Sequence, residues 1–276
     1  MKGMQTAVAV VMAGLLLAGC DKAPSGPVAD AIYHGGPILT MAGDEPAYVE
    51  ALAVRDGRIQ FTGTLAQASA LKGEATRDVD LAGRALLPGF IDAHGHIANV
   101  GFQALSANLL PPPDGDGQSI GTLVALLKDW AQDNNRLLQE SGWIIGFGYD
   151  DSQLAEKRHP TADDLDRVST ERPVLIVHQS GHLGVLNHKG LEMAGYGSDT
   201  PDPAGGVIRR GADGVTPDGV LEEMAFFAPL FSLFATFDQD MKKALALAGV
   251  DAYTAQGFTT AQEGRSDPGT AETWRS

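Results

Sequence analysis

The chain has 276 residues, of which 43% are hydrophobic and 20% charged, with a net charge of −15 and a single cysteine. This length provides one large domain or two ordinary ones, with enough apolar side chains for a core. The acidic balance disfavours binding to a phosphate backbone, so no nucleic-acid partner is expected. One cysteine cannot form an internal disulfide. The 34 glycines follow no repeat period, which excludes a collagen-like or low-complexity chain.

The N-terminus has the features of an export signal. A positively charged start precedes an apolar run over residues 7–18, which suits the ~7–15-residue core of a secretory signal better than the ~20 residues of a membrane span. Leu17-Ala-Gly-Cys20 resembles a bacterial lipobox, which implies a signal peptide over residues 1–19 and acylation of Cys20 as a lipid anchor. We therefore expect an exported lipoprotein on the periplasmic face of a membrane. Asp21, beside the anchor, points to the inner membrane.

The segment after the anchor is expected to contain a tether and a small β module. Residues 20–30, with two prolines and a glycine, form the lipid-anchored tether. Residues 31–84 are predicted to form a β-sandwich-like module, in which Asp56-Gly57 marks the turn of a hairpin. Thr64-Leu-Ala-Gln67 has the sequence of a capping box at the start of a short helix. The module contains no constellation of catalytic residues, so its expected role is structural.

Helix and strand patterns alternate in the rest of the chain, which predicts parallel βα units and an α/β fold. The apolar periodicity of residues 119–138 and 240–256 indicates helices. The Gly- and Pro-rich residues 201–219 are expected to form an inserted loop or hairpin. Strands are expected over residues 85–96, 143–149, 174–177 and 258–262.

The first of these strands is expected to end in His94 and His96. Residues i and i+2 of a strand point to the same face, so the two imidazoles should project together. Two imidazoles on one rigid edge suit the binding of one divalent cation. Asp92 faces the same way and is expected to orient one of the histidines. A solvent-facing histidine pair that binds nothing is the alternative.

The string Leu87-Pro-Gly-Phe-Ile-Asp-Ala-His-Gly-His96, directly after a β module, resembles the amidohydrolase superfamily. Further matches point to its family 3 and run in the family's order from about Ala31 to Gly264. They include Gly142 to Asp150, Arg172-Pro-Val174, Gly181-His182, Asn187, Asp202-Pro203, Gly205-Gly206, Gly219-Val-Leu221 with Glu223, and Gly257-Phe-Thr-Thr260. The resemblance implies a (β/α)8 TIM-like barrel. It also implies a metal-dependent hydrolase, with zinc as the expected metal, that acts on non-peptide carbon–nitrogen bonds of a small amide-like substrate.

The resemblance also implies roles for individual residues. In related barrels a His-x-His from the first strand holds the metal, and a carboxylate from the fourth strand can bind or bridge it. Counting strands along the sequence places Glu263 at the end of the fourth, which implies a third metal ligand; a carboxylate that only caps the next helix is the alternative. His182 matches the family's Gly-His position after the third strand. It is expected to contact the substrate, together with Tyr149 and Asp150.

The other histidines and acids are expected to have structural duties. His178 is expected to be a core or hydrogen-bonding histidine, whereas His34, His159 and His188 should be ordinary surface groups. Glu222 and Glu223 are expected to open a helix, where carboxylates favour the helix dipole.

The superfamily's proton carrier, an aspartate on the last barrel strand, has no counterpart in the sequence. The residues after Pro88 fall short of the ~250 of a complete barrel, so residues 85–276 are expected to be its N-terminal half, with about the first four strands. We therefore expect a truncated chain that is inactive as given. The alternative is a non-catalytic envelope lipoprotein that binds a metal or small ligand through the same histidines. A serine hydrolase is disfavoured, because Gly117-Gln-Ser-Ile-Gly121 has the Gly-x-Ser-x-Gly spacing but follows a Pro- and Gly-rich segment rather than a strand. No P-loop is present, and the sequence leaves homo-oligomer formation open.

Overall fold

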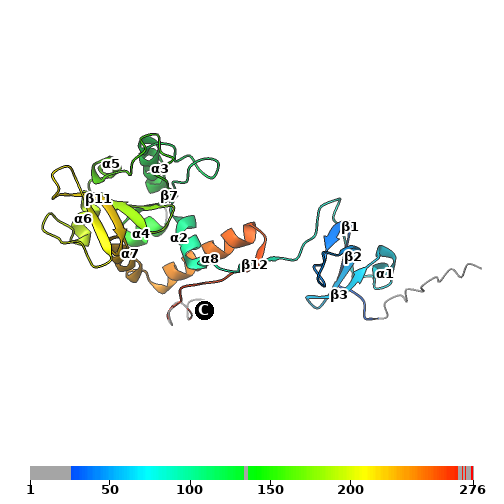
Figure 1. Ribbon diagram of the computed structural model, residues 1–276. Coiled ribbons are helices and arrows are strands. Elements are labelled where there is room, and N and C mark those ends of the chain that lie inside the picture. Colours follow the sequence, from blue (N-terminus) through cyan, green and yellow to red (C-terminus); the bar gives the residue numbers. More distant parts are fainter. Residues whose placement is uncertain (1–25, 134–135, 267–268, 270, 272–274, 276) are drawn as a thin grey trace, which may run out of the picture. The chain divides into compact units, whose positions relative to one another are not determined.

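The computed structural model describes residues 26–133 and 136–266, together with 269, 271 and 275 (Figure 1). The predicted signal peptide and Cys20 lie outside these residues. The chain divides into two compact units between Pro88 and Gly89. Among the described residues, no helix combines the length and apolar character that crossing a membrane requires.

The N-terminal unit is a four-stranded sheet with the order β3-β2-β1-β4. Its strands are β1 (Ala31–Leu39), β2 (Tyr48–Arg55), β3 (Arg58–Gly63) and β4 (Arg77–Asp80). The predicted hairpin is confirmed, since β2 and β3 pair in antiparallel fashion. Asp56 and Gly57 at its turn both have positive φ, as a tight two-residue turn requires.

One short helix covers this sheet. Helix α1 (Leu65–Ser69) begins at the predicted capping box, because Thr64 and Gln67 exchange side-chain-to-backbone hydrogen bonds. Ala68 of α1 packs with Ile32 and Ala51 of the sheet in a small apolar cluster. Within the described residues the unit contains one sheet rather than two facing sheets, which differs from the predicted sandwich.

The C-terminal unit is built on a six-stranded mixed sheet with the order β10-β11-β9-β8-β7-β6. Strands β6 (Ala107–Asn108), β7 (Ile144–Tyr149) and β8 (Val174–His178) are parallel. Strands β9 (Leu183–Leu186), β11 (Pro217–Glu223) and β10 (Gly206–Arg210) continue the sheet in antiparallel fashion. The Gly- and Pro-rich segment was expected to be a loop or a hairpin. It forms a hairpin, and this hairpin belongs to the main sheet.

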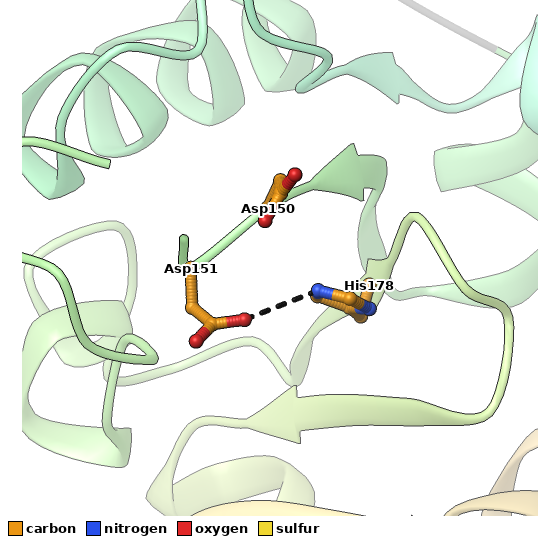
Figure 2. Close-up of side chains that lie close together, drawn as sticks. All are labelled: Asp150, Asp151 and His178. Atoms are coloured by element: carbon orange, nitrogen blue, oxygen red, sulfur yellow. Dashed lines mark ion pairs between the residues drawn. The ribbon is translucent and has the colours of Figure 1, made fainter. Parts of the chain in front are cut away.

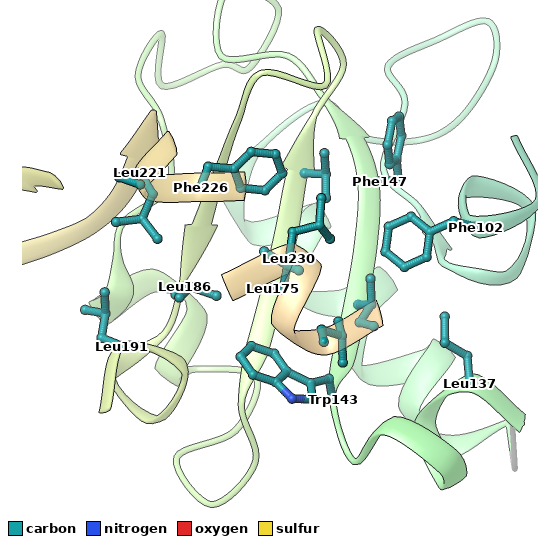
Figure 3. Packing of buried hydrophobic residues seen from close by; sticks show 14 of the residues in the cluster. Phe102, Leu137, Trp143, Phe147, Leu175, Leu186, Leu191, Leu221, Phe226 and Leu230 are labelled. Atoms are coloured by element: carbon teal, nitrogen blue, oxygen red, sulfur yellow. The ribbon is translucent and has the colours of Figure 1, made fainter. Parts of the chain in front are cut away.

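Helices cover both faces of this sheet, which explains why β7 and β8 are apolar throughout. On one face α2 (Ile97–Leu105) and α7 (Met224–Ala235) supply Phe102, Phe226 and Leu230 (Figure 3). On the other face α3 (Ile120–Gln132) and α5 (Ala162–Asp166) supply Leu123 and Leu165, among others. Each of these side chains contributes roughly 1.5–3 kcal/mol when fully buried.

The helix expected over residues 119–138 is two helices. Helix α3 ends at Gln132, where Asp133 leaves the helical conformation, and α4 spans Arg136–Ser141. Two further helices lie near the ends of strands. Helix α6 (His188–Ala194) follows β9, and α8 (Gln239–Ala255) confirms the helix expected over residues 240–256.

Strands β5 (Phe90–Ile91) and β12 (Phe258–Thr260) pair in parallel and form a separate two-stranded sheet. Strand β12 therefore does not follow β8 as the fourth strand of one sheet, and the strand count used to place Glu263 was wrong. The helices that follow β5 and precede β12, α2 and α8, pack with their backbones in close contact. A Cβ atom at Gly101 would lie 1.8 Å from the carbonyl oxygen of Leu245. This packing holds the segment after β12 beside the segment after β5.

Candidate metal site and active-site residues

His94 and His96 lie beyond the end of a strand rather than on it. Strand β5 ends at Ile91, and His94 occupies a bend. The imidazole rings are nevertheless neighbours, with centroids 5.4 Å apart in an edge-to-face arrangement. The same-face argument for a regular strand therefore fails locally, whereas the expected proximity of the two rings is present.

Glu263 lies beside His96, although the two residues are 167 positions apart in the sequence. Its Oε1 lies 3.4 Å from His96 Nδ1, and the Glu263 side chain is only 10% exposed. The other oxygen, Oε2, accepts a hydrogen bond of 2.9 Å from the backbone N–H of Ala98 in the first turn of α2. Oε1 also accepts one from the N–H of Arg265. Glu263 thus holds the first turn of α2 and contacts His96 at the same time. The helix that it caps precedes it in the chain, whereas the sequence alternative was a cap of the next helix.

Asp92 acts on the backbone of the histidine loop. Its Oδ1 accepts a hydrogen bond from the N–H of His94, while Oδ2 accepts from the Tyr253 hydroxyl and the N–H of Gln262. Burial, and then the hydrogen bond to Asp92, raise the pKa of Tyr253, so its hydroxyl keeps the proton that it donates. Asp92 therefore connects β5, α8 and the end of β12. No hydrogen bond to an imidazole is present among its described contacts.

Gly95 permits this close packing. A Cβ atom at this position would lie 2.0 Å from Asp92 Oδ2 and 2.3 Å from the Tyr253 hydroxyl oxygen. A side chain there would push apart the groups that fix the loop between the two histidines.

Two groups of three metal-ligating side chains, with all ligand atoms within 4.8 Å of one another, occur in the described part of the chain. The histidine pair with Glu263 is in neither of them. One group, Asp163, Asp166 and His188, is exposed, and its closest contact is the 2.8 Å pair between His188 Nδ1 and Asp166 Oδ2. Asp166 also accepts the N–H of His188 at the start of α6, so this group is accounted for by helix capping.

The second group, Asp150, Asp151 and His178, lies at the carboxyl ends of β7 and β8 (Figure 2). His178 Nε2 lies 3.2 Å from Asp151 Oδ1. Asp150 is buried and accepts hydrogen bonds from the Ser152 N–H and hydroxyl and from the amides of Gln153 and Gln179. Burial raises the pKa of Asp150, but the hydrogen bonds from Gln153 and Ser152 outweigh it and leave the pKa below its ordinary value.

His159 and Tyr149 adjoin this second group. The Tyr149 hydroxyl lies 3.1 Å from His159 Nδ1, and the Tyr149 residue is completely buried. Burial, followed by the nearby Asp151 charge, raises the pKa of Tyr149, so its hydroxyl is the donor. The side chain of His159 is only 14% exposed, so the expectation of an ordinary surface histidine was wrong.

His182 forms an exposed pair with Glu223. Its Nδ1 lies 3.2 Å from both carboxylate oxygens, and the ring lies against Phe227. A proton on Nδ1 suits this pairing with a carboxylate, and in that tautomer Nε2 is an acceptor. Glu223 ends β11 and directly precedes α7, so it occupies the capping position of that helix rather than its first turn. Its φ of 49° and ψ of −121° are unusual for a residue with a side chain, and strain of this kind concentrates at functional sites.

The sequence interpretation missed the proximity of Asp151 and His178. The signal was present, because each residue follows an apolar strand and neighbouring parallel strands bring their carboxyl ends to one edge. The pairing of β7 with β8 places Tyr149 directly beside His178 in register.

Comparison with known proteins supports the family resemblance. The family model described as "Amidohydrolase family" matches residues 77–276. The chain is 33% identical over 230 residues to the protein named "Putative amidohydrolase YtcJ" of Bacillus subtilis, which covers 83% of this chain and 41% of that protein. It is 29% identical over 229 residues to the N-substituted formamide deformylase of Arthrobacter pascens, covering 82% of this chain and 41% of that enzyme. The chain thus spans less than half the length of these curated relatives.

The mixed α/β fold also has a solved counterpart. An uncharacterized metal-dependent hydrolase from Pyrococcus horikoshii matches with a TM-score of 0.59 at 20% identity, over 89% of this chain and 45% of that one. At this identity the likeness concerns the fold alone.

Proposed function

This chain belongs to the amidohydrolase family, and we propose that it carries the metal-holding part of a hydrolase for small amide-like substrates. The bond cleaved is a carbon–nitrogen bond other than a peptide bond. Two contacts carry the proposal within a family of hydrolases: the ring of His94 neighbours that of His96, and Glu263, from the other end of the C-terminal unit, contacts His96. Because the chain covers 41% of its curated relatives, the activity is proposed for a polypeptide of their length.

The donor set fits a divalent transition metal. Two imidazoles and one carboxylate are the ligand types that zinc prefers at catalytic sites. His96 and Glu263 offer donor atoms 3.4 Å apart, and the His94 ring is exposed beside them. Such an ion, when bound, supplies a Lewis acid that polarises a carbonyl group and activates water. We infer zinc as the ion from this donor chemistry.

The surrounding residues of the chain hold the ligands in place. Asp92 fixes the backbone of His94, with the Tyr253 hydroxyl as its partner. Glu263 is held by backbone N–H groups on both of its oxygens, so its position depends on the start of α2. Anchored ligands of this kind lose little freedom when a metal binds, which favours affinity.

The substrate class rests on the family and on one relative. An N-substituted formamide deformylase is among the curated relatives, and its name describes the removal of a formyl group from a substituted amide nitrogen. We propose that His182 contributes to binding such a substrate through its free Nε2, which can accept a hydrogen bond from an amide N–H. Asp150 and Tyr149, which we expected near the substrate, support the strand ends behind this surface through their buried hydrogen bonds.

The architecture that we propose is the N-terminal half of a (β/α)8 barrel. The parallel strands β6, β7 and β8, with helices on both faces, support it, as does the parallel pair of β5 and β12. The four-stranded sheet of the N-terminal unit supports one layer of a β-sandwich-like module.

We also propose that the protein is exported and anchored through an acylated Cys20 to the periplasmic face of a membrane, and that Asp21 retains it at the inner membrane. The support is the lipobox-like sequence alone. Replacing Cys20 by Ser should move the protein from the membrane fraction to the soluble fraction of cells. Unchanged membrane association would contradict acylation.

Zinc binding by the full chain tests the proposed function. Equilibrium dialysis followed by elemental analysis should show a zinc ion that is lost in the double variant His94→Ala, His96→Ala. The matched control is His34→Ala, which removes a histidine paired with Asp78 at 3.0 Å in the N-terminal unit. Zinc content that is the same in the double variant, the control and the unaltered chain would refute the site.

A further inference from the structure

We propose that Asp151 and His178 form a second divalent-cation site, separate from the histidine pair and Glu263. The proposal does not depend on the hydrolase function. It rests on the ends of two neighbouring strands, a buried nitrogen that lacks a hydrogen-bond partner, and a carboxylate directed toward it.

The two side chains are brought together by the central sheet. Strands β7 and β8 pair in parallel, so the residues that follow or end them lie at the same edge. Asp151 follows β7 by two residues, and His178 is the last residue of β8. Both strands are buried for nearly their whole length, which gives the site a rigid base. Figure 2 shows the Asp151 side chain extending toward the His178 ring.

The buried nitrogen is Nε2 of His178. Its surface is inaccessible to solvent, and it has no hydrogen-bond partner among the described residues. Asp151 Oδ1 is 3.2 Å away but lies outside the alignment that a hydrogen bond needs. A buried polar atom without a partner is costly and rare, and an ion that is bound there is one of its standard explanations. The pair is therefore better placed to share a cation than to bond directly.

The separation of the donor atoms agrees with this interpretation. Ligand atoms bound about 2.1 Å from one ion lie roughly 3.0–3.4 Å apart in octahedral or tetrahedral geometry. The distance of 3.2 Å between His178 Nε2 and Asp151 Oδ1 falls in that range. Asp150, which also has an oxygen nearby, is excluded as a ligand because four hydrogen bonds already occupy its carboxylate.

Ser180 prepares the histidine for a metal. A metal on Nε2 requires the ring proton to sit on Nδ1, where it needs an acceptor. The Ser180 hydroxyl oxygen lies 2.9 Å from Nδ1 and can accept that proton. Without the metal, the N–H of Ser180 donates to Nδ1 over 3.1 Å, which leaves the proton on Nε2. The same serine therefore serves both tautomers, and metal binding exchanges the Nε2 proton for the ion.

The charges around the site also suit a cation. His159 lies beside it, with Nδ1 3.7 Å from Asp151 Oδ1. Arg209, whose charge acts on the neighbouring Tyr149 and His159, is paired with Glu222. A carboxylate with an imidazole suits Zn²⁺, Co²⁺ or Mn²⁺, and two protein ligands give a weaker site than three.

The test uses the full chain with His94 and His96 both replaced by Ala, so that its outcome is independent of the first site. Zinc and cobalt binding is measured by isothermal titration in this background. We expect one ion per chain to bind. Asp151→Asn and His178→Gln, which preserve shape, should each weaken the binding at least tenfold. His188→Gln removes the exposed histidine beside Asp166 and should leave the affinity unchanged.

Three outcomes would overturn the proposal. One is that the background chain binds neither ion. The second is that Asp151→Asn and His178→Gln bind as tightly as the background. The third is that only His188→Gln loses the ion. Circular dichroism and a thermal melt of each variant confirm that it is folded. A metal-induced rise in melting temperature that disappears in Asp151→Asn provides a second measure of the same site.

Discussion

Glu263 contacts His96 across 167 positions of sequence, with its Oε1 3.4 Å from the imidazole Nδ1. The same carboxylate accepts the N–H of Ala98 and so holds the first turn of α2. The start of a helix, a histidine and the segment after β12 therefore share one negative charge that is largely shielded from solvent. This relationship makes the proposed metal site sensitive to changes that leave the histidines themselves intact.

Replacing Glu263 by Gln should weaken zinc binding to the chain at least tenfold. The amide keeps the size of the side chain but removes the negative charge, and its NH2 group cannot accept the hydrogen bond from Ala98 or Arg265. Equilibrium dialysis measures the effect, with Glu192→Gln on the exposed face of α6 as the matched control. Equal affinity of both variants would show that Glu263 only caps α2.

Replacing Gly95 by Ala should also weaken zinc binding, by displacing the loop that carries the two histidines. The new Cβ would lie 2.0 Å from Asp92 Oδ2, and we expect a loss of about 1–3 kcal/mol in the free energy of unfolding. The control is Gly197→Ala, because nothing lies within 4 Å of a Cβ atom there. Urea denaturation and zinc dialysis measure the two effects. If both alanine variants behave alike, the tight packing around Gly95 does not constrain the site.

Replacing Asn187 by Ala should destabilise the protein by about 3 kcal/mol, because several buried groups lose their partners. Asn187 is completely buried. Its amide donates to the carbonyls of Ser169 and Arg172, and its oxygen accepts the N–H groups of Val174 and Gly190. Urea denaturation gives the value, and Asn99→Ala on the exposed side of α2 is the control. A change below 1 kcal/mol would mean that water replaces these bonds.

The protein should lose stability as the pH falls below about 6.5, the ordinary pKa of histidine. Burial lowers the pKa of His159. The charge of Asp151 raises this pKa, whereas the charges of Arg209 and His178 lower it further, and the net shift is downward. The unfolded chain therefore binds a proton at a higher pH than the folded chain. Between the unfolded pKa and the lower folded one, acid favours unfolding.

The variant His159→Gln tests whether His159 causes this loss of stability in acid. Its urea midpoint should change less between pH 7.5 and pH 5.5 than that of the unaltered chain. An identical pH dependence of the two proteins would assign the effect to other groups.

Local signals were sufficient to predict several elements. The Asp56-Gly57 hairpin, the capping box at Thr64 and helix α8 all depend on residues close in sequence, and all three are confirmed. The order of the sheet was not predicted. Strand β6 has two residues, too few for any periodicity, and β9 is a short apolar run that could belong to a strand or a helix.

In the candidate site, too, local signals predicted contacts between residues close in sequence and did not predict contacts between distant residues. Neighbouring rings at His94 and His96 were predicted from a regular strand that is absent there; the rings are neighbours because only one residue separates them. The partners of Glu263 depend on α8 packing against α2 and on the pairing of β12 with β5. The pair of Asp151 and His178 depends on two strands lying side by side. Contacts of this kind form only in the tertiary fold, which cannot be predicted from secondary-structure propensity and motif spacing alone.

The most direct test of the central claim is an anomalous difference map, at the zinc absorption edge, from crystals of the full chain grown with zinc. We predict a peak within bonding distance of His94, His96 and Glu263. A map with zinc elsewhere on the protein, and no peak between these three side chains, would contradict the account.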